Sequence, residues 1–377
     1  MPEFIEYFIE EAKKKQRDIT WIFSDNPKDE NERILKEKIK YYWHNLPLDS
    51  QPIYRTEFAV DGSRATRSFS NGAEMLVVRS LMIGMDQRYK QLFLDVYRGA
   101  ANSEATERYA RIISHLLETD IILNNIDELD GSIVLIDGSI HGRYLHSLRM
   151  WPLHIIGRED VPLKLLNRHL QLLKECKKRD IMMIGISKTS QIRAYSSNIT
   201  GGKVLIPDSE ILYRWTEDKG FTTPLMLGNY GFDRNIAKLL IYDPEKLAKN
   251  LTFADTDYNT ILKTIMHLRN APSIVTFFMR LNKGEPTIRV DVPGYVIGVN
   301  KSIISDPEFI DPEQVYPILN IVINGYGGNN VHNALLYTVD RLVRLKKSTV
   351  DKVYIEILRN ITGETIEFDR SYRRSLQ

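Results

Sequence analysis

Two short stretches of this sequence, FAVDGSR (residues 58–64) and LIDGSIHG (residues 135–142), decide how the fold is interpreted. Each is an apolar run typical of a buried strand, and each leads into Asp-Gly-Ser, at Asp61 and at Asp137. Asp-Gly is an ordinary turn signal, so a single copy needs no further explanation. Two copies at the ends of two strand-like runs allow a second interpretation, in which both carboxylates belong to one metal site.

Length and composition place the chain among soluble globular proteins. It has 377 residues, of which 43% are hydrophobic and 27% charged, and its formal net charge is +2. That charge neither requires nor excludes nucleic acid, because a basic groove can lie on a nearly neutral molecule. The single cysteine, Cys176, excludes an intramolecular disulfide and a multi-cysteine zinc site. No apolar stretch approaches the roughly 20 residues that span a bilayer, so we expect a cytoplasmic protein.

Both ends of the chain are expected to lie outside the main domain. Residues 1–50 predict a helical extension, with helices over about 2–17 and 31–46. Helical spacing places four apolar side chains of the first helix on one face: Phe4, Ile5, Phe8 and Ile9. We interpret this face as a surface either for a partner or for the protein's own core. Residues 351–377 predict a strand at about 352–359 and then a mobile tail.

Residues 51–350 have the pattern of one main α/β domain. Three strand-like runs with short connections predict an antiparallel meander. The predicted elements are, in chain order, strands 53–63, 73–85 and 91–100, helix 103–119 with Ser103 as its N-cap, strand 131–140, helix 161–179 and strand 180–188. A short helix near 208–217, a hairpin with its turn at Lys283-Gly284 and a helix over about 329–345 complete the domain.

The order of these elements predicts a ribonuclease-H-like mixed sheet flanked by helices. In that topology the first and fourth strands are neighbours, so Asp61 and Asp137 lie side by side. Two carboxylates this close repel each other unless a cation neutralises them. A hard divalent ion with oxygen ligands is the natural occupant. Gly62 and Gly138 leave the adjacent backbone open to a substrate phosphate.

The helix between the two motifs offers a third acid. It carries Glu104, Glu107 and Glu118, and we expect Glu107, near the helix start, to point back to the carboxylate edge. Two aspartates and a glutamate around Mn²⁺ or Mg²⁺ make a phosphodiester-cleaving site, because the metal activates water and stabilises the charge that develops on phosphorus. Glu104 and Glu118 stay open as alternatives, and a solvated helix face is the ordinary interpretation of all three.

Three later residues extend the candidate site. Lys188 ends another apolar strand, where a lysine can hold a phosphate. In GYGGNNVH (residues 325–332) a glycine-rich turn leads into a helix N-terminus, which is an anion site. His332, expected on the first helical turn, is a candidate to ligate metal or move a proton, and Tyr326 to orient it or to stack on a base. An exposed lysine and a flexible loop before a capped helix are the ordinary alternatives.

Other chemistries find less support in the sequence. It contains neither a GxxxxGK[ST] phosphate-binding loop nor a GxSxG nucleophile elbow. Three histidines, His141, His146 and His154, follow the second Asp-Gly-Ser motif without the spacing of a zinc motif. We interpret them as loop residues, with His141 near the site because it is close to Asp137 in sequence.

The order of the motifs resembles that of the NurA nucleases. AVDGS, a helix with a glutamate, LIDGS, a strand ending in Ser-Lys, and a late tyrosine with a histidine six residues on occur in this order from about Phe58 to Leu345. The two Asp-Gly-Ser motifs are the most specific part of the resemblance. The positions it carries over are Asp61, Glu107 and Asp137 as acidic metal ligands, Lys188 as the strand-end lysine, and Tyr326 and His332 as the late pair.

The resemblance implies a ribonuclease-H-like fold and Mn²⁺-dependent cleavage of single- and double-stranded DNA, with Mg²⁺ as the second candidate metal. It implies 5′-to-3′ exonuclease and single-strand endonuclease activities in the end resection of DNA double-strand breaks. It also implies a ring-like homodimer that works with the HerA hexameric helicase-translocase, an ATPase.

Two other functions stay open when only the residues are considered. The first is a non-catalytic adaptor, a DNA-threading ring for a motor ATPase. Such an adaptor has no need of three carboxylates, a lysine and a histidine, and this chain has all of them, which favours the enzyme. The second is a ribonuclease on the same fold, since recognition of a 2′-hydroxyl leaves no sequence mark that we can identify.

Overall fold

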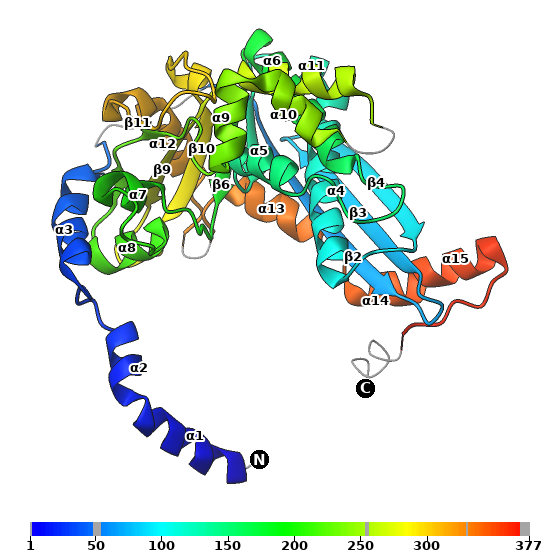
Figure 1. Cartoon of the computed structure of the whole chain (residues 1–377), viewed down its shortest axis with the longest axis horizontal. Coiled ribbons are helices and arrows are strands. Elements are labelled where there is room, and N and C mark those ends of the chain that lie inside the picture. The colour runs from blue at the N-terminus through cyan, green and yellow to red at the C-terminus, as the bar shows by residue number, and fades with distance from the viewer. Residues whose placement is uncertain (1, 48–53, 253–255, 329–330, 370–377) are drawn as a thin grey trace.

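Helices cover both faces of one large mixed sheet, and a helical arm extends away from it at the N-terminus (Figure 1). The computed structural model describes residues 2–47, 54–252, 256–328 and 331–369. In these residues the main path of the sheet runs β1-β7-β9-β10-β6-β5-β2-β3-β4; off this path, β8 pairs with β9, and β11 pairs with β8. Within the described parts of the chain, no helix combines the length and the apolar character needed to cross a membrane.

The predicted meander forms one end of the sheet. β2 (Glu57–Ser68) pairs antiparallel with β3 (Glu74–Ile83), which pairs antiparallel with β4 (Arg88–Tyr97). On its other side β2 pairs in parallel with β5 (Ile133–Asp137), and β5 in parallel with β6 (Met182–Ser187). The first and fourth strands of the predicted domain are therefore neighbours, as the sequence indicated.

The other end of the sheet is built from antiparallel pairs. β10 (Ile288–Pro293) pairs antiparallel with β6 on one side and with β9 (Ile274–Arg280) on the other. β9 and β10 form the predicted hairpin. The remaining strands are short: β1 (Trp43–His44), β7 (Gly220–Thr222), β8 (Leu225–Met226) and β11 (Glu308–Phe309). Three helices pack at this end: α3 (Glu30–Ile39), α7 (Ala194–Thr200) and α8 (Asp208–Trp215).

The alternation of side chains along β2 and β5 gives each strand two buried faces. Phe58 and Val60 pack with one layer of helices, whereas Ala59 belongs to the core on the opposite face. The first layer contains α4 (Ser103–Asn124), α5 (Ile140–Arg149), α6 (Val161–Lys178), α9 (Arg234–Tyr242), α10 (Pro244–Leu251) and α11 (Tyr258–Arg269). The opposite layer contains α12 (Tyr316–Asn324) and α13 (Ala334–Val343). Each of these strands is thus packed between two layers of helices, one on each face of the sheet.

The predicted final strand is wrong, because residues 352–359 are helical. The turn η5 (Val350–Tyr354), of π-helical geometry, follows α14 (Lys347–Thr349) and continues into α15 (Ile355–Thr362). Val350 and Ile355 are buried against the β2–β3 end of the sheet. A helix can place one apolar stripe on that face, and this packing overrides the short alternating pattern of the sequence. Of the predicted tail, residues 370–377 lie outside the described residues.

The N-terminal extension is helical but differs in detail from the prediction. The first predicted helix is divided into α1 (Pro2–Lys14) and α2 (Gln16–Ile22). The second predicted helix, expected to reach residue 46, is α3, which ends at Ile39. The turn η1 (Lys40–Tyr42) follows it, and then β1, which pairs with β7. The 103–119 helix extends to Asn124, and its N-cap is Asn102 rather than Ser103. Further short turns are η2 (Ile126–Glu128), η3 (Gly294–Ile297) and η4 (Pro312–Val315).

Candidate active site

Asp61 and Asp137 lie at adjacent positions of two parallel strands. The β2–β5 ladder pairs Val60 with Ile136, so the next residue of each strand is an aspartate at the same level of the sheet. By the alternation of β2, the Asp61 side chain lies on the face covered by α13, and the Cα–H of Gly62 faces α4. The ladder therefore brings the two aspartates of the Asp-Gly-Ser motifs together.

The Asp61 carboxyl is in an unfavourable environment for a negative charge. Burial, followed by the negative charges of Glu118 and Asp137, raises its pKa to about 8. The backbone N–H of Gly62 donates to Asp61 Oδ1 at 2.7 Å and offsets only part of this effect. The charge of Asp340, on α13, raises the pKa further. Asp61 thus lies in a concentration of negative charge that is only partly compensated by the protein.

Of the three candidate glutamates of α4, Glu118 is the one whose charge acts on Asp61. Glu107 is 53% exposed and forms ion pairs with Arg64 at 2.8 Å and Arg111 at 3.8 Å. Glu118 is only 7% exposed, and its charge acts on Asp61. Burial, together with the charge of Asp137, raises the pKa of Glu118 in spite of the opposing charge of Arg143. The other alternative, Glu104, is exposed on the first turn of α4 and pairs with Arg108.

Arg143 of α5 holds Glu118 in position. Arg143 Nη2 donates to Glu118 Oε2 at 2.7 Å, and Arg143 Nη1 donates to the hydroxyl of Thr119 at 2.9 Å. The other carboxylate oxygen, Oε1, accepts from the Ser114 hydroxyl at 3.1 Å. A buried carboxylate needs such partners, since an isolated buried charge is strongly destabilising. Arg143 lies six residues after Asp137, so one segment supplies both an acid of the site and the partner of another.

Gly62 is needed for the close approach of Glu118 to β2. A Cβ atom at this position would lie 2.5 Å from Glu118 Oε1 and 2.7 Å from Ser114 Oγ. Both distances are shorter than ordinary van der Waals contact. The glycine after Asp61 therefore does not form a turn, since β2 continues for six residues beyond it. It provides room for a carboxylate from the opposite layer.

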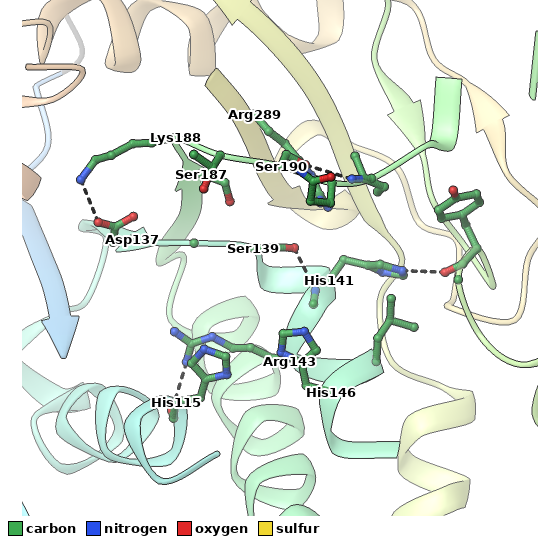
Figure 2. A pocket seen from close by; sticks show the side chains of 18 of the residues that line it. His115, Asp137, Ser139, His141, Arg143, His146, Ser187, Lys188, Ser190 and Arg289 are labelled. Atoms are coloured by element: carbon green, nitrogen blue, oxygen red, sulfur yellow. Dashed lines mark hydrogen bonds and ion pairs between the residues drawn. The ribbon is translucent and has the colours of Figure 1, made fainter. Parts of the chain in front are cut away.

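Lys188 pairs with Asp137 at the end of β6. Its Nζ lies 3.0 Å from Asp137 Oδ2, as Figure 2 shows. Burial lowers the pKa of Lys188, but the negative charges of Asp137, Asp340 and Asp61 outweigh this and raise it. Lys188 is therefore a cation that faces the acidic site.

His332 and Tyr326 lie on the segment between α12 and α13. His332 precedes α13 by two residues, rather than lying on its first turn, and Asn333 caps the helix. Burial and the charge of Lys188 lower the pKa of His332, against the charges of Glu285 and Asp137. The Tyr326 hydroxyl donates to Glu285 Oε1 at 2.6 Å, which raises the pKa of Tyr326 to about 12. The tyrosine is thus oriented by Glu285, a residue that the sequence did not single out.

The histidines of α5 also differ from the prediction. His141 and His146 are helical residues rather than loop residues, and α5 begins directly after the second Asp-Gly-Ser motif. Ser139 is its N-cap, with its hydroxyl accepting from the Gly142 N–H at 2.9 Å. The ring of His146 stacks on that of His115 from α4, with 5.7 Å between centroids. Asp137 is therefore followed by a helix N-terminus, not by an irregular loop.

The donor set of the site fits a hard divalent cation in its chemistry. Asp61, Asp137 and Glu118 supply only carboxylate oxygens, which are the ligands that Mg²⁺ and Mn²⁺ prefer. The raised pKa of Asp61 shows negative charge that such an ion would compensate. Among the described residues, however, no three His, Cys, Asp or Glu side chains lie close enough together to enclose a metal ion. Asp137 and Glu118 are instead paired with Lys188 and Arg143.

The fold and the site together define a class of protein: a mixed α/β protein with two aspartates at the end of the ladder between two parallel strands, and with cations that pair with the acids. A family model described as the NurA domain matches residues 55–303 of the chain. Because this is more than half of its length, the chain belongs to the NurA family. The resemblance and the mixed α/β fold expected from the sequence are both confirmed.

Individual relatives agree with this assignment. The DNA double-strand break repair nuclease NurA of Saccharolobus solfataricus is 26% identical over 284 residues, which are 70% of this chain and 73% of that protein. The crystal structure of the NurA nuclease from Sulfolobus solfataricus is similar with a TM-score of 0.62 at 16% identity, over 97% of this chain and 98% of that one. A crystal structure of NurA bound to dAMP and manganese is similar with a TM-score of 0.54 at 12% identity, over 90% and 96%.

We expect Gly62→Ala to displace Glu118. The added methyl group meets Glu118 Oε1, which Arg143 and Ser114 hold in place, so the free energy of unfolding should fall by about 1–3 kcal/mol. A double-mutant cycle with Glu118→Ala checks the cause, because the cost of Gly62→Ala should shrink when the carboxylate is absent. Equal costs in both backgrounds, measured by chemical denaturation, would show that Glu118 is not what excludes a side chain at this position.

The stability of the protein without divalent metal should depend on pH through Asp61. An unfolded aspartate has a pKa of about 3.9, whereas the folded value is about 8. Between these values the unfolded chain releases the proton and the folded chain keeps it, so the free energy of unfolding falls as the pH rises from about 4 to about 8. Asp61→Asn removes this loss and should be more stable than wild type at pH 8 by roughly 2 kcal/mol, allowing for relaxation of the site.

Thermal melting in EDTA at pH 5 and at pH 8 measures this difference. The advantage of Asp61→Asn should be small at pH 5 and larger at pH 8, and adding Mn²⁺ should raise the melting temperature of wild type more than that of the variant. An advantage that does not change with pH would mean that Asp61 is an ordinary solvated residue.

Proposed function

We propose that this protein is a metal-dependent deoxyribonuclease. One observation carries the proposal: the parallel β2–β5 ladder holds Asp61 and Asp137 at the same level of the sheet, where Lys188 faces them. Phosphodiester cleavage requires a nucleophilic water and compensation of charge on phosphorus, and carboxylate-bound metal with an adjacent cation meets both needs. The relative from Saccharolobus solfataricus is a DNA double-strand break repair nuclease, which supports DNA as the substrate.

The metal ligands that we propose are Asp61, Asp137 and Glu118, with His332 as a further candidate. A divalent ion held by these residues would activate water and stabilise the charge that develops on phosphorus. Mn²⁺ is the first candidate, because solved NurA structures contain manganese, and Mg²⁺ is the second. Arg143 keeps the Glu118 carboxylate oriented, and Lys188 holds a non-bridging oxygen of the phosphate.

His332 is suited to moving a proton. Its lowered pKa means that its imidazole is neutral near pH 7 and has a nitrogen free to accept a proton. The direction of the shift follows from burial and from the charge of Lys188, so the same lysine that faces the phosphate keeps the histidine neutral. Tyr326, oriented by Glu285, provides a phenol that stays protonated, because its pKa is about 12. It is therefore a hydrogen-bond donor or a stacking surface rather than a base.

In more detail, we propose 5′-to-3′ exonuclease and single-strand endonuclease activities, which act in the end resection of DNA double-strand breaks. We propose that the enzyme is a homodimer that works with a HerA-type hexameric ATPase. The structure of the N-terminal arm, α1 and α2, supports the proposal of a protein partner. In Figure 1, α1 and α2 extend away from the body of the molecule. The α1 face with Phe4 and Phe8 is exposed, at 77% and 74%, and exposed apolar faces of this kind mark interaction surfaces.

Cleavage of end-labelled single- and double-stranded DNA tests the nuclease directly. Asp61→Ala, Asp137→Ala and Glu118→Gln should each reduce metal-dependent cleavage by roughly 100-fold or more, because each removes charge that the reaction needs. Glu107→Gln is the matched control, since Glu107 lies on the same helix as Glu118 but is exposed and paired with Arg64. Assays with Mn²⁺, with Mg²⁺ and with EDTA define the metal, and melting curves show that each variant is folded.

The outcomes separate the alternative functions. Metal-dependent cleavage that survives Asp61→Ala or Asp137→Ala would mean that the Asp-Gly-Ser motifs are structural. Loss of cleavage in Glu107→Gln but not in Glu118→Gln would restore the assignment made from the sequence. Folded wild-type protein that cleaves no DNA, even with a HerA-type ATPase, would favour the adaptor, and preferential cleavage of RNA would favour the ribonuclease.

Deletion of residues 1–17 tests the partner surface. The arm contributes little to the body of the protein, so DNA cleavage and the melting temperature should stay within error of wild type, whereas affinity for a HerA-type ATPase should fall by about tenfold or more. Phe4→Ser with Phe8→Ser is the milder variant, and Tyr242→Ser, at another exposed aromatic residue, is its control. Unchanged affinity in a pull-down or by calorimetry would remove the arm from the ATPase interface.

A further inference from the structure

A pocket of about 720 Å³ begins at Asp137 and continues away from the acidic site. Its walls are the end of β6 and the segment after it (residues 187–193), one side of α5 as far as its last residue, Arg149, and the Tyr230–Gly231 turn. Figure 2 shows Asp137 and Lys188 at one side of this space and His141 at the other. The volume is that of a small-ligand site, so the pocket can hold a nucleotide-sized group rather than a duplex.

The charge of the pocket is strongly positive. Five basic side chains line it, and Asp137 is its only acidic lining residue among those described. Three of these cations have carboxylate partners: Lys188 pairs with Asp137, Arg143 with Glu118 and Arg289 with Asp291. The other two are Arg149 and Arg193, and neither forms an ion pair with any described residue. Two arginines are thus free to bind an anion.

Arg149 is held at the pocket by its neighbours. Its Nη2 donates to the carbonyl of Gly231 at 2.5 Å. A guanidinium has five N–H donors, so this bond fixes the group and leaves donors for a ligand. Arginine binds phosphate oxygens in pairs, which makes it more selective for phosphate than a simple positive charge.

The pocket also contains polar atoms that lack partners. His115, His141 and His146 line it, and each has a buried Nδ1 without a hydrogen-bond partner among the described residues. His141 is fully buried, and its other ring nitrogen, Nε2, lies 2.8 Å from the carbonyl oxygen of Tyr230. Buried polar atoms are normally satisfied, so these nitrogens point to a polar ligand or to ordered water in this space. The N-terminal end of α5, with its partial positive charge, lies beside them.

We propose that this pocket binds the terminal phosphate of a DNA strand and thereby sets which phosphodiester lies at Asp137. The inference rests on the proposed nuclease function, and it adds a specificity determinant, recognition of a phosphorylated strand end. A terminal phosphate carries a charge of about −1.5 to −2 at pH 7, against −1 for an internal phosphodiester. Two unpaired arginines favour the group with more charge and more free oxygens. Asp137 at the rim places the bound end beside the acidic site.

Binding of short oligodeoxynucleotides to the full-length protein tests the proposal without cleavage. One sequence with an internal fluorophore carries a 5′-phosphate, a 3′-phosphate or hydroxyl groups at both ends, and anisotropy is measured in EDTA. Wild type should bind one phosphorylated form about tenfold more tightly than the hydroxyl form. The phosphorylated form that is preferred identifies which strand end enters the pocket.

Arg149→Gln with Arg193→Gln should abolish this preference and leave affinity for the hydroxyl form within about twofold. Arg98→Gln, at an exposed arginine that follows β4 at the far edge of the sheet, is the matched control and should keep the preference. If the double variant does not fold, the two single variants are used, and each should lose part of the preference. Equal binding of all three oligonucleotides by wild type, or a preference that survives in the folded variants, would overturn the proposal.

The test is independent of catalysis. Asp61→Ala should keep the preference for the phosphorylated end, because Asp61 does not line the pocket. A protein that cleaves DNA with metal but does not distinguish strand ends would contradict only the pocket. A protein that distinguishes strand ends through Arg149 and Arg193 but never cleaves DNA would contradict the nuclease and leave the pocket as a binding site.

Discussion

The parallel pairing of β2 with β5 is the constraint on which the candidate site depends. Four consecutive residue pairs, from Glu57–Ile133 to Val60–Ile136, fix the register of the two strands. A shift of the register by one residue would turn one aspartate to the other face of the sheet. The buried apolar residues on both faces of these strands oppose such a shift, since it would expose them or force them into the wrong layer. The core therefore holds together two carboxyl groups whose ionised forms repel each other, and burial together with this repulsion raises the pKa of Asp61.

The electrostatic consequence extends beyond the two aspartates. Burial of Asp61 beside Glu118 and Asp137 raises its pKa to about 8, and the protein offsets the charge of the other two acids with Lys188 and Arg143. Each cation comes from a different element, the end of β6 and the middle of α5. These ion pairs connect the acids to the pocket, because Lys188 and Arg143 line it as well. The acidic site and the basic pocket thus share Lys188 and Arg143, which pair with acids of the site and line the pocket.

Sequence patterns predicted the sheet correctly where the pattern was local and long. The meander, the doubly buried β5 and the hairpin of β9 and β10 follow from alternation and turn residues. The prediction of a C-terminal strand was wrong, because a run of about five alternating residues fits either a strand or a helix. Packing on the β2–β3 face of the sheet selected the helix. The sequence analysis expected Glu107 as the third acid, whereas in the structure the glutamate whose charge acts on Asp61 is Glu118. Glu118 lies in the buried stripe of α4, with Ile121 and Ile122, and an acid within an apolar stripe is the sequence signal that could have singled it out.

The sequence by itself determined the strands that carry Asp61 and Asp137, their parallel pairing and the presence of Lys188 at the next strand end, because strand periodicity and chain order are local properties. The tertiary structure alone decided which glutamate approaches the aspartates, that Gly62 makes room for it and that Arg143 holds it. It also decided that Tyr326 is paired with Glu285 and that Arg149 and Arg193 share a pocket. These relations join residues far apart in the chain, and they depend on how the helix layers pack on the sheet.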